Sequence, residues 1–81
     1  MSNPRKRVTQ NKRKYQVLLA VMRETRVSTG MTQEDLARLM NISRSQYTAL
    51  ESGRSMLSVD HLFSIARAYG MSTWRFLQDS V

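Results

Sequence analysis

The feature that most constrains this fold is the close succession of helix start and stop signals between residues 31 and 55. Thr32 is a good N-cap for a first short helix. Asn41 tolerates left-handed backbone angles and can therefore end that helix at once. Ser43 then caps a second helix, and Gly53 is the residue most at ease in the left-handed position that ends it. The stretch therefore predicts two short helices joined by a tight turn.

Each of these two helices has an apolar face. In the first, Leu36, Leu39 and Met40 recur at helical spacing. In the second, Tyr47 and Leu50 are three residues apart and so lie on one face. The other face of the second helix carries polar or small side chains near its start and middle, namely Arg44, Ser45, Thr48 and Ala49.

The pattern T-Q-E-D-L-A…N-I-S-x-x-x-Y-x-x-L-E-x-G resembles the helix–turn–helix of the Cro/CI-type (XRE-like) phage and bacterial repressors. Asn41 stands where glycine is usual, and Tyr47 stands where a β-branched aliphatic residue is commoner. The resemblance runs from about Leu18 to Leu77 and so covers most of the chain. It implies a compact, all-α, five-helix bundle of the lambda-repressor-like type, whose second motif helix enters the major groove of DNA.

The resemblance implies that the exposed face of the second motif helix meets DNA bases. Arg44 can donate two parallel hydrogen bonds to the O6 and N7 atoms of guanine, the commonest specific base contact. The methyl groups of Thr48 and Ala49 can pack on a thymine methyl, whereas Ser45 discriminates less. The alternative for Arg44 is an ordinary surface charge or a phosphate contact. The base-contacting candidates are Arg44, Ser45, Thr48 and Ala49.

A second group of residues is expected to contact phosphates. Gln33 lies at the start of the first motif helix, where its amide and free backbone N–H groups can bind a phosphate oxygen. Simple helix capping is the alternative for Gln33, and both roles are compatible. The residues after the second helix are placed for the opposite strand. The full set of candidates is Gln33, Gln46, Ser52, Arg54 and Ser55.

The basic charge is concentrated at one end of the chain. Lys and Arg total 13 against 6 acids, and residues 1–14 hold six of the basic residues and no acid. Residues 1–10 lack apolar periodicity, so we expect a flexible basic arm there and a helix–turn–helix domain over residues 11–81. Phosphate contact by the arm is the favoured role over lipid attraction or mere solubility. The arm candidates are Arg5, Lys6, Arg7, Lys12 and Arg13.

Three further helices are expected around the motif. The first begins near Asn11, carries an apolar face and stops at Gly30. Another follows Ser58 and ends at Gly70. A short last helix covers residues 73–78. The apolar residues of the first and of the later long helix are Tyr15, Leu18, Leu19, Met22, Leu62, Ile65, Ala66 and Tyr69.

Two further roles follow from the resemblance. The register places Arg26 opposite Glu51, so that an inward-facing ion pair ties the first helix to the second motif helix. The last helix is where such proteins often dimerise, and Trp74, Phe76 and Val81 are the candidates for a two-fold contact. The alternative for Trp74 is that it covers the core of the monomer.

Several classes of function are excluded. The chain has no cysteine and only one histidine, His61, so we expect no metal site and no cofactor. No serine has a histidine base at a recognisable spacing, so we expect no enzyme. No apolar run approaches the roughly 20 residues of a membrane span, and no signal peptide is recognisable, so a cytoplasmic protein of bacterial or phage origin is expected.

These features together predict a sequence-specific transcriptional regulator that binds double-stranded DNA. A homodimeric repressor that reads a palindromic operator is the leading hypothesis, with no small-molecule ligand expected. The alternative is an antitoxin-like protein-interaction module whose DNA binding is autoregulatory. Such modules usually devote an extra segment to their protein partner, and only the basic arm is spare here.

Overall fold

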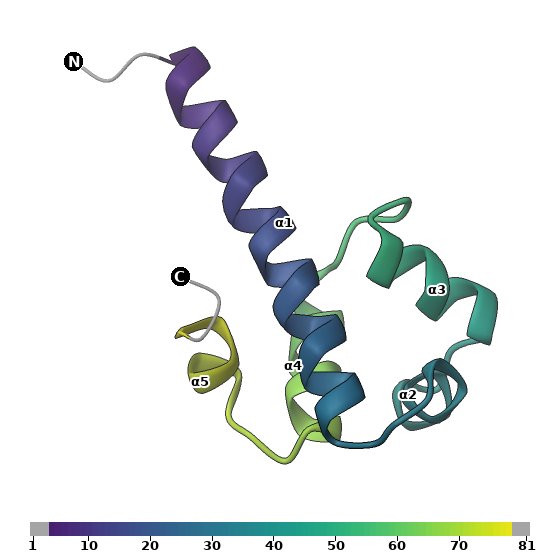
Figure 1. Cartoon of the computed structure of the whole chain (residues 1–81). Coiled ribbons are helices and arrows are strands. Elements are labelled where there is room, and N and C mark those ends of the chain that lie inside the picture. Colours follow the sequence, from purple (N-terminus) through teal and green to yellow (C-terminus); the bar gives the residue numbers. More distant parts are fainter. Residues whose placement is uncertain (1–3, 79–81) are drawn as a thin grey trace.

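Five α-helices make up the part of the chain that the structure describes (Figure 1). The computed structural model describes residues 4–78, apart from the side chains of residues 4–11, 73 and 74. Within that part there is no strand, and no helix is long and apolar enough to cross a membrane. The helices are α1 (Pro4–Ser28), α2 (Gln33–Met40), α3 (Arg44–Ser52), α4 (Val59–Ala68) and α5 (Thr73–Gln78). The expected all-α, five-helix fold is confirmed.

The first helix is longer than the sequence led us to expect. α1 begins at Pro4 and not near Asn11, so residues 4–10 continue the helix and are not an irregular arm. Proline fits the first turn of a helix, because its missing N–H would have no helical partner there. Lys, Arg and Gln that follow are good helix formers although they give no apolar periodicity. The first turns of α1 project beyond the other helices (Figure 1).

The helix boundaries inside the domain are fixed by side chains that bond to backbone groups. Thr32, Ser43 and Ser58 each accept a hydrogen bond from the backbone N–H three residues later, and in each case that later side chain accepts one in return. Asn41 has φ 58° and Gly53 has φ 85°, so both helix ends use the left-handed conformation. The residues that close the three reciprocal caps are Asp35, Gln46 and His61.

α1 runs through the middle of the molecule, with α2 and α3 on one side of it and α5 on the other (Figure 1). α2 packs against α3 and α4, while α4 also packs against α5. The side chains from all five helices meet in one core, which includes Leu18, Met22, Leu36, Ala37, Met40, Tyr47, Leu50, Ile65, Ala66 and Phe76.

Leu39 does not belong to this core, contrary to expectation. It is 60% exposed, whereas Leu36, Ala37 and Met40 are buried. Each helical residue advances by about 100°, so these three buried residues span about 100° of the α2 surface. Leu39 falls outside that arc on the side of Leu36. The i, i+3 spacing alone did not distinguish which side of Leu36 faces the core.

Phe76 was expected at a dimer contact, and this prediction is wrong. Its side chain is completely buried within the single chain, and its ring centroid lies 5.8 Å from that of Tyr69. The Tyr69 hydroxyl in turn donates a hydrogen bond of 2.7 Å to the Met22 carbonyl oxygen of α1. Phe76 therefore anchors α5 to the core. The side chain of Trp74 and residue Val81 lie outside the described part, so their contacts stay predictions.

Replacing Gly53 by alanine should lower the free energy of unfolding by more than the same change at Gly30. Both glycines have positive φ, which costs an L-residue about 1–2 kcal/mol. A Cβ at Gly53 would also lie 3.2 Å from the Leu19 Cδ1 atom, whereas a Cβ at Gly30 would meet no atom within 4 Å. Urea unfolding of Gly53→Ala and Gly30→Ala measures the difference. Equal losses would mean that Leu19 moves aside without cost.

Candidate nucleic-acid interface

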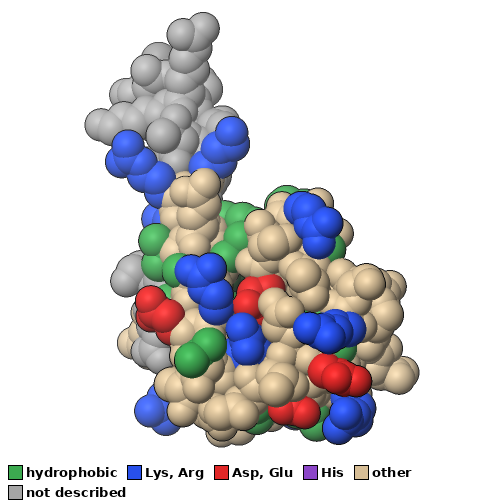
Figure 2. Space-filling view, turned by 45° about the vertical axis from the view of Figure 1, so that its right-hand side comes forward, with side chains coloured by type: hydrophobic (Ala, Val, Ile, Leu, Met, Phe, Trp, Pro, Cys, Tyr) green, Lys and Arg blue, Asp and Glu red, His purple; other side chains and the backbone are tan. Residues whose placement is uncertain are grey.

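The four candidate base-contacting residues share the outer side of α3. Arg44 and Ser45 are exposed, and Thr48 and Ala49, one turn later, are half-buried. The opposite side of the same helix is held in the core, where Tyr47 is completely buried. The N-terminal half of α3 is therefore exposed on one side, while its other side is held in the core. Figure 2 shows the α2–α3 side of the molecule, on which basic and acidic side chains are interspersed.

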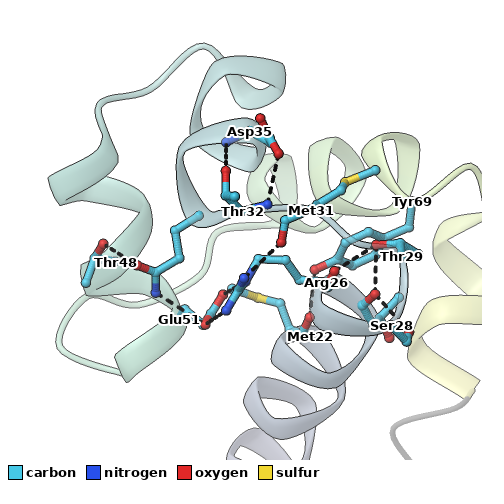
Figure 3. A network of polar contacts seen from close by, with 12 residues as sticks. Met22, Arg26, Ser28, Thr29, Met31, Thr32, Asp35, Thr48, Glu51 and Tyr69 are labelled. Carbon is cyan, nitrogen blue, oxygen red and sulfur yellow. Dashed lines mark hydrogen bonds and ion pairs between the residues drawn. The ribbon is translucent and has the colours of Figure 1, made fainter.

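Arg26 and Glu51 connect α1 to α3 through a two-pronged ion pair (Figure 3). The Arg26 Nε atom donates to Glu51 Oε2 at 2.9 Å, and Nη2 donates to Oε1 at 3.1 Å. Nη1 donates to the Met31 carbonyl oxygen at 3.0 Å, in the loop before α2. The two side chains are only 13% and 5% exposed. One guanidinium group therefore joins three segments of the fold, with the paired geometry that makes such bonds strong.

The protonation of this pair is fixed by its surroundings. Burial alone would raise the pKa of Glu51, but the hydrogen bonds and charge of Arg26 outweigh it and hold that pKa below its ordinary value. The hydrogen bond to Glu51 raises the pKa of Arg26 further. Both groups are therefore ionised at neutral pH. The Glu51 carboxylate on α3 is therefore neutralised inside the protein by Arg26.

Gln33 extends this network to the outer side of α3. Its Nε2 atom donates to Glu51 Oε1, and its Oε1 atom accepts a hydrogen bond from the Thr48 hydroxyl, both at 3.4 Å. The amide of Gln33 therefore faces α3 in this structure. Its predicted phosphate contact would replace one or both of these long, weak bonds. No sequence pattern predicted this bridge, because Gln33 is 15 residues from Thr48 and 18 residues from Glu51.

Tyr47 fills the space beneath α3 where an aliphatic residue is commoner. Its hydroxyl oxygen is buried and has no hydrogen-bond partner among the described residues. Burial raises the pKa of Tyr47, and it also raises the pKa of Tyr69 to about 12. Both phenols are therefore neutral at physiological pH. Tyr47 serves here as a large packing residue that sets the distance between α3 and the core.

The candidate phosphate-contacting residues lie at both ends of α3. At its start, Gln46 is exposed and its side-chain oxygen accepts a bond of 2.8 Å from the Ser43 N–H. Beyond its end, the exposed Arg54 donates through Nε to the Ser52 hydroxyl at 3.2 Å. The Ser55 N–H returns to the Ala49 carbonyl oxygen at 3.0 Å, which closes the turn. The turn thus holds one cation and two hydroxyl groups close together.

The loop after α3 rests on α1 near the start of its described side chains. The Leu57 N–H donates to the Tyr15 hydroxyl at 3.0 Å, a contact between residues 42 positions apart that sequence reasoning missed. Lys12 and Arg13 are exposed and lie within one helical turn of Tyr15. Basic side chains gather where α1 leaves the domain (Figure 2). The other arm candidates, Arg5, Lys6 and Arg7, have side chains outside the described part.

Comparison with known proteins decides the family. A sequence profile of the helix-turn-helix family matches residues 22–73, which is more than half of the chain. The chain belongs to the XRE-like helix–turn–helix family. An uncharacterised HTH-type transcriptional regulator from Methanothermobacter thermautotrophicus is 42% identical over 50 residues, which cover 62% of this chain and 72% of that protein.

Two crystal structures of the clp gene regulator ClgR from Corynebacterium glutamicum are similar in fold. They are 30% identical to this chain and cover 83% of it, with TM-scores of 0.74 and 0.73. The matched region makes up 71% of one ClgR chain and 87% of the other. The family consists of DNA-binding regulators and not of enzymes, so the expectation of a non-enzymatic protein is confirmed. Residues 4–78 hold no group of three described side chains suited to bind a metal ion.

Replacing Arg26 by methionine should lower the free energy of unfolding by about 3–5 kcal/mol at pH 7, because Glu51 is left buried without its partner. The double variant Arg26→Met/Glu51→Leu should recover most of this loss, since neither charge then remains buried. Chemical unfolding of the three proteins measures both effects. A double variant as unstable as the single one would show that packing, and not charge, is responsible.

The decrease in the free energy of unfolding caused by Arg26→Met should be smaller at acidic pH. The folded-state pKa of Glu51 is lowered, so the contribution of the pair is present above the ordinary value of 4.5 and disappears as the pH falls through the folded-state value. In Arg26→Met, burial raises the pKa of Glu51 because the guanidinium no longer opposes it. As the pH falls, Glu51 becomes protonated and the variant no longer carries an unpaired buried charge. Unfolding at pH 4 should therefore separate the two proteins less than unfolding at pH 7.

Proposed function

We propose that this protein is a repressor of transcription that binds a palindromic operator in double-stranded DNA as a homodimer. The observation that carries the proposal is the position of Arg44, which is exposed on the first turn of α3. The other side of that helix is joined to α1 by the ion pair between Arg26 and Glu51. A family match over residues 22–73 supports the same conclusion. The names of the similar proteins, which are regulators, are consistent with it.

Sequence reading is proposed to come from the exposed side of α3 in the major groove. Arg44 donates two hydrogen bonds to a guanine, and Ser45 contacts a neighbouring base edge. Thr48 and Ala49 offer methyl groups to thymine. The Thr48 hydroxyl is bonded to Gln33 in the free protein, and a phosphate contact by Gln33 that replaces this bond would release the hydroxyl.

Phosphate contacts are proposed to fix the position of α3 without reading sequence. Gln33 and Gln46 bind one strand near the start of α3, and the turn formed by Ser52, Arg54 and Ser55 binds the other. The basic end of α1, with Lys12 and Arg13, adds charge beyond this turn. Each neutralised phosphate releases counterions, so binding is strongly salt-dependent.

Repression in this proposal is steric, because a dimer on the operator blocks access to the promoter. The two-fold symmetry of the dimer matches the two half-sites of the operator, about one helical turn apart. Trp74 and Val81 stay the candidates for a dimer contact that the sequence suggested. The protein is proposed to act in the cytoplasm of a bacterium or of a phage-infected cell.

The experiment that tests this function compares binding to the DNA upstream of the protein's own gene with binding to a random duplex. At near-physiological salt we expect a preference of about 1000-fold or more and a two-fold symmetric footprint. Weak binding to both DNAs would overturn the proposal. It would direct the search to a protein partner, as in the antitoxin-like alternative.

Arg44→Ala should weaken operator binding by about 1–3 kcal/mol and relax the preference at one base pair in each half-site. Binding to random duplex should change little, because the lost contact reads a base. Arg75→Ala is a matched control, since it removes the same charge from an exposed position on α5. Equal losses on operator and random DNA would show that Arg44 contacts only phosphate.

The double variant Lys12→Ala/Arg13→Ala should flatten the dependence of log affinity on log salt concentration by about 1.8 for each copy of the bound dimer, or about 0.9 for each lost phosphate contact. Operator and random DNA should be affected alike. Fluorescence anisotropy titrations at several salt concentrations give the slopes. An unchanged slope would show that this end of α1 does not touch DNA.

A further inference from the structure

The outer face of α4 carries large apolar side chains that the fold of the chain does not use. Met56 is 73% exposed, Val59 is 65% exposed and Phe63 is 53% exposed. They follow one another at intervals of three and four residues, so Val59 and Phe63 share a helix face and Met56 immediately precedes it. Single exposed apolar residues are ordinary, but a row of them marks an interaction surface.

The inner face of α4 already satisfies the packing of the chain. Ile65 and Ala66 are completely or almost completely buried, and α4 contacts α2 and α5. Phe63 and Val59 point to the other side of the helix and are not needed for this packing. Their exposure is therefore a property of the surface and not a consequence of an incomplete core.

Two opposite charges lie on either side of Phe63 along this face. Asp60 and Arg67 are both exposed and lie seven residues apart on α4, with Phe63 between them. Seven residues correspond to nearly two helical turns, or about 10.5 Å. Within the described part of the chain, neither side chain forms an ion pair or a hydrogen bond. The α4 outer face, defined as Met56, Val59, Asp60, Phe63 and Arg67, thus reads acid, aromatic, base along the helix.

We propose that the α4 outer face binds the same face of a second copy of this chain. The two α4 helices lie antiparallel about a two-fold axis that passes close to Phe63. In this arrangement Asp60 of each copy faces Arg67 of the other, Phe63 packs between the two ion pairs, and Val59 lies one residue outside them. A two-fold interface must be complementary to itself, and an acid and a base on either side of an apolar centre meet that requirement.

The position of this face in the chain fits a dimer that reads two half-sites. Met56 is three residues beyond Gly53, so at most about 11 Å of extended chain separates the face from the end of α3. A two-fold axis here keeps both copies of α3 near the centre of the dimer. Trp74 lies on α5, which is on the other side of α1 from α3 (Figure 1).

The small size of the face sets the expected strength of the dimer. Three apolar residues and one ion pair per copy bury less than the roughly 800 Å² per partner of a standard stable interface. The free protein is therefore a weak dimer, and the operator brings two copies together. This use of the dimer rests on the proposed function, whereas the self-association itself does not.

Charge exchange provides the sharpest test. Asp60→Arg places the introduced arginine of each copy against Arg67 of the other, so the dimer dissociation constant from sedimentation equilibrium should rise by at least tenfold. Asp60→Arg/Arg67→Asp restores opposite charges across the axis and should return it to within about threefold of the wild type. Circular dichroism confirms that each variant is folded. A double variant as weak as the single one would overturn the proposal.

Phe63→Ser tests the apolar part of the interface, with Val27→Ser as the matched control. Val27 is also exposed, at 62%, but lies on α1 away from this face. Phe63→Ser should weaken dimerisation and cooperative binding to a full operator, while binding to an isolated half-site stays unchanged. An unchanged dimer constant in Phe63→Ser together with a weakened one in Trp74→Ala would overturn the proposal in favour of α5.

These measurements separate this inference from the proposed function. Loss of operator recognition in Arg44→Ala with an unchanged dimer constant supports both. Self-association through Phe63 in a protein that shows no preference for any DNA would support the interface and contradict the repressor. A wild-type protein that stays monomeric at millimolar concentration and binds its operator without cooperativity would overturn the interface alone.

Discussion

The ion pair between Arg26 and Glu51 is the interaction on which the rest of the structure depends. It joins the end of α1, the loop before α2 and the last turn of α3 through one guanidinium group. A carboxylate this close to the proposed DNA-binding surface would oppose binding if it were exposed. Because the Glu51 carboxylate is buried and paired, Arg26 neutralises its charge. The same contact orients α3.

α3 has too few residues to be stable on its own. A helix of nine residues is marginal in water, so its position comes from its surroundings. Tyr47 and Leu50 hold it from below, the Ser43 cap fixes its start and Gly53 fixes its end. These contacts lie on the buried side of the helix or at its ends, and one weak bond joins Thr48 on its outer side to Gln33. The outer side, with Arg44 and Ser45, is therefore free to follow the sequence of a target without disturbing the fold.

The features that could be predicted from the sequence are local. The caps at Thr32, Ser43 and Ser58 were found because a side chain and a backbone group only three residues apart decide them. The partnership of Arg26 with Glu51 came from resemblance to a family, since the residues are 25 positions apart.

What could not be predicted depends on tertiary packing or on weak local preference. The burial of Phe76 and the exposure of Leu39 depend on which side of a short helix meets the core, and spacing alone leaves that open. The start of α1 at Pro4 follows from the absence of a helix-breaking residue, which apolar periodicity does not report. In the site, the bridge made by Gln33 was missed for the same reason as any contact between distant segments.

Because α1 is one continuous helix, a small change in its angle displaces its far end by a larger distance. A helix of 25 residues is about 38 Å long, and the portion before Tyr15, where the loop after α3 rests against it, accounts for about 16.5 Å of that length. A stiff rod cannot wrap around a duplex, so the reach of its basic end is set by the angle at which the domain holds it. A tilt of about 5° at the base moves the far end by about 1.4 Å, which is enough to make or break a hydrogen bond. The residues that fix this angle therefore act on contacts far from themselves.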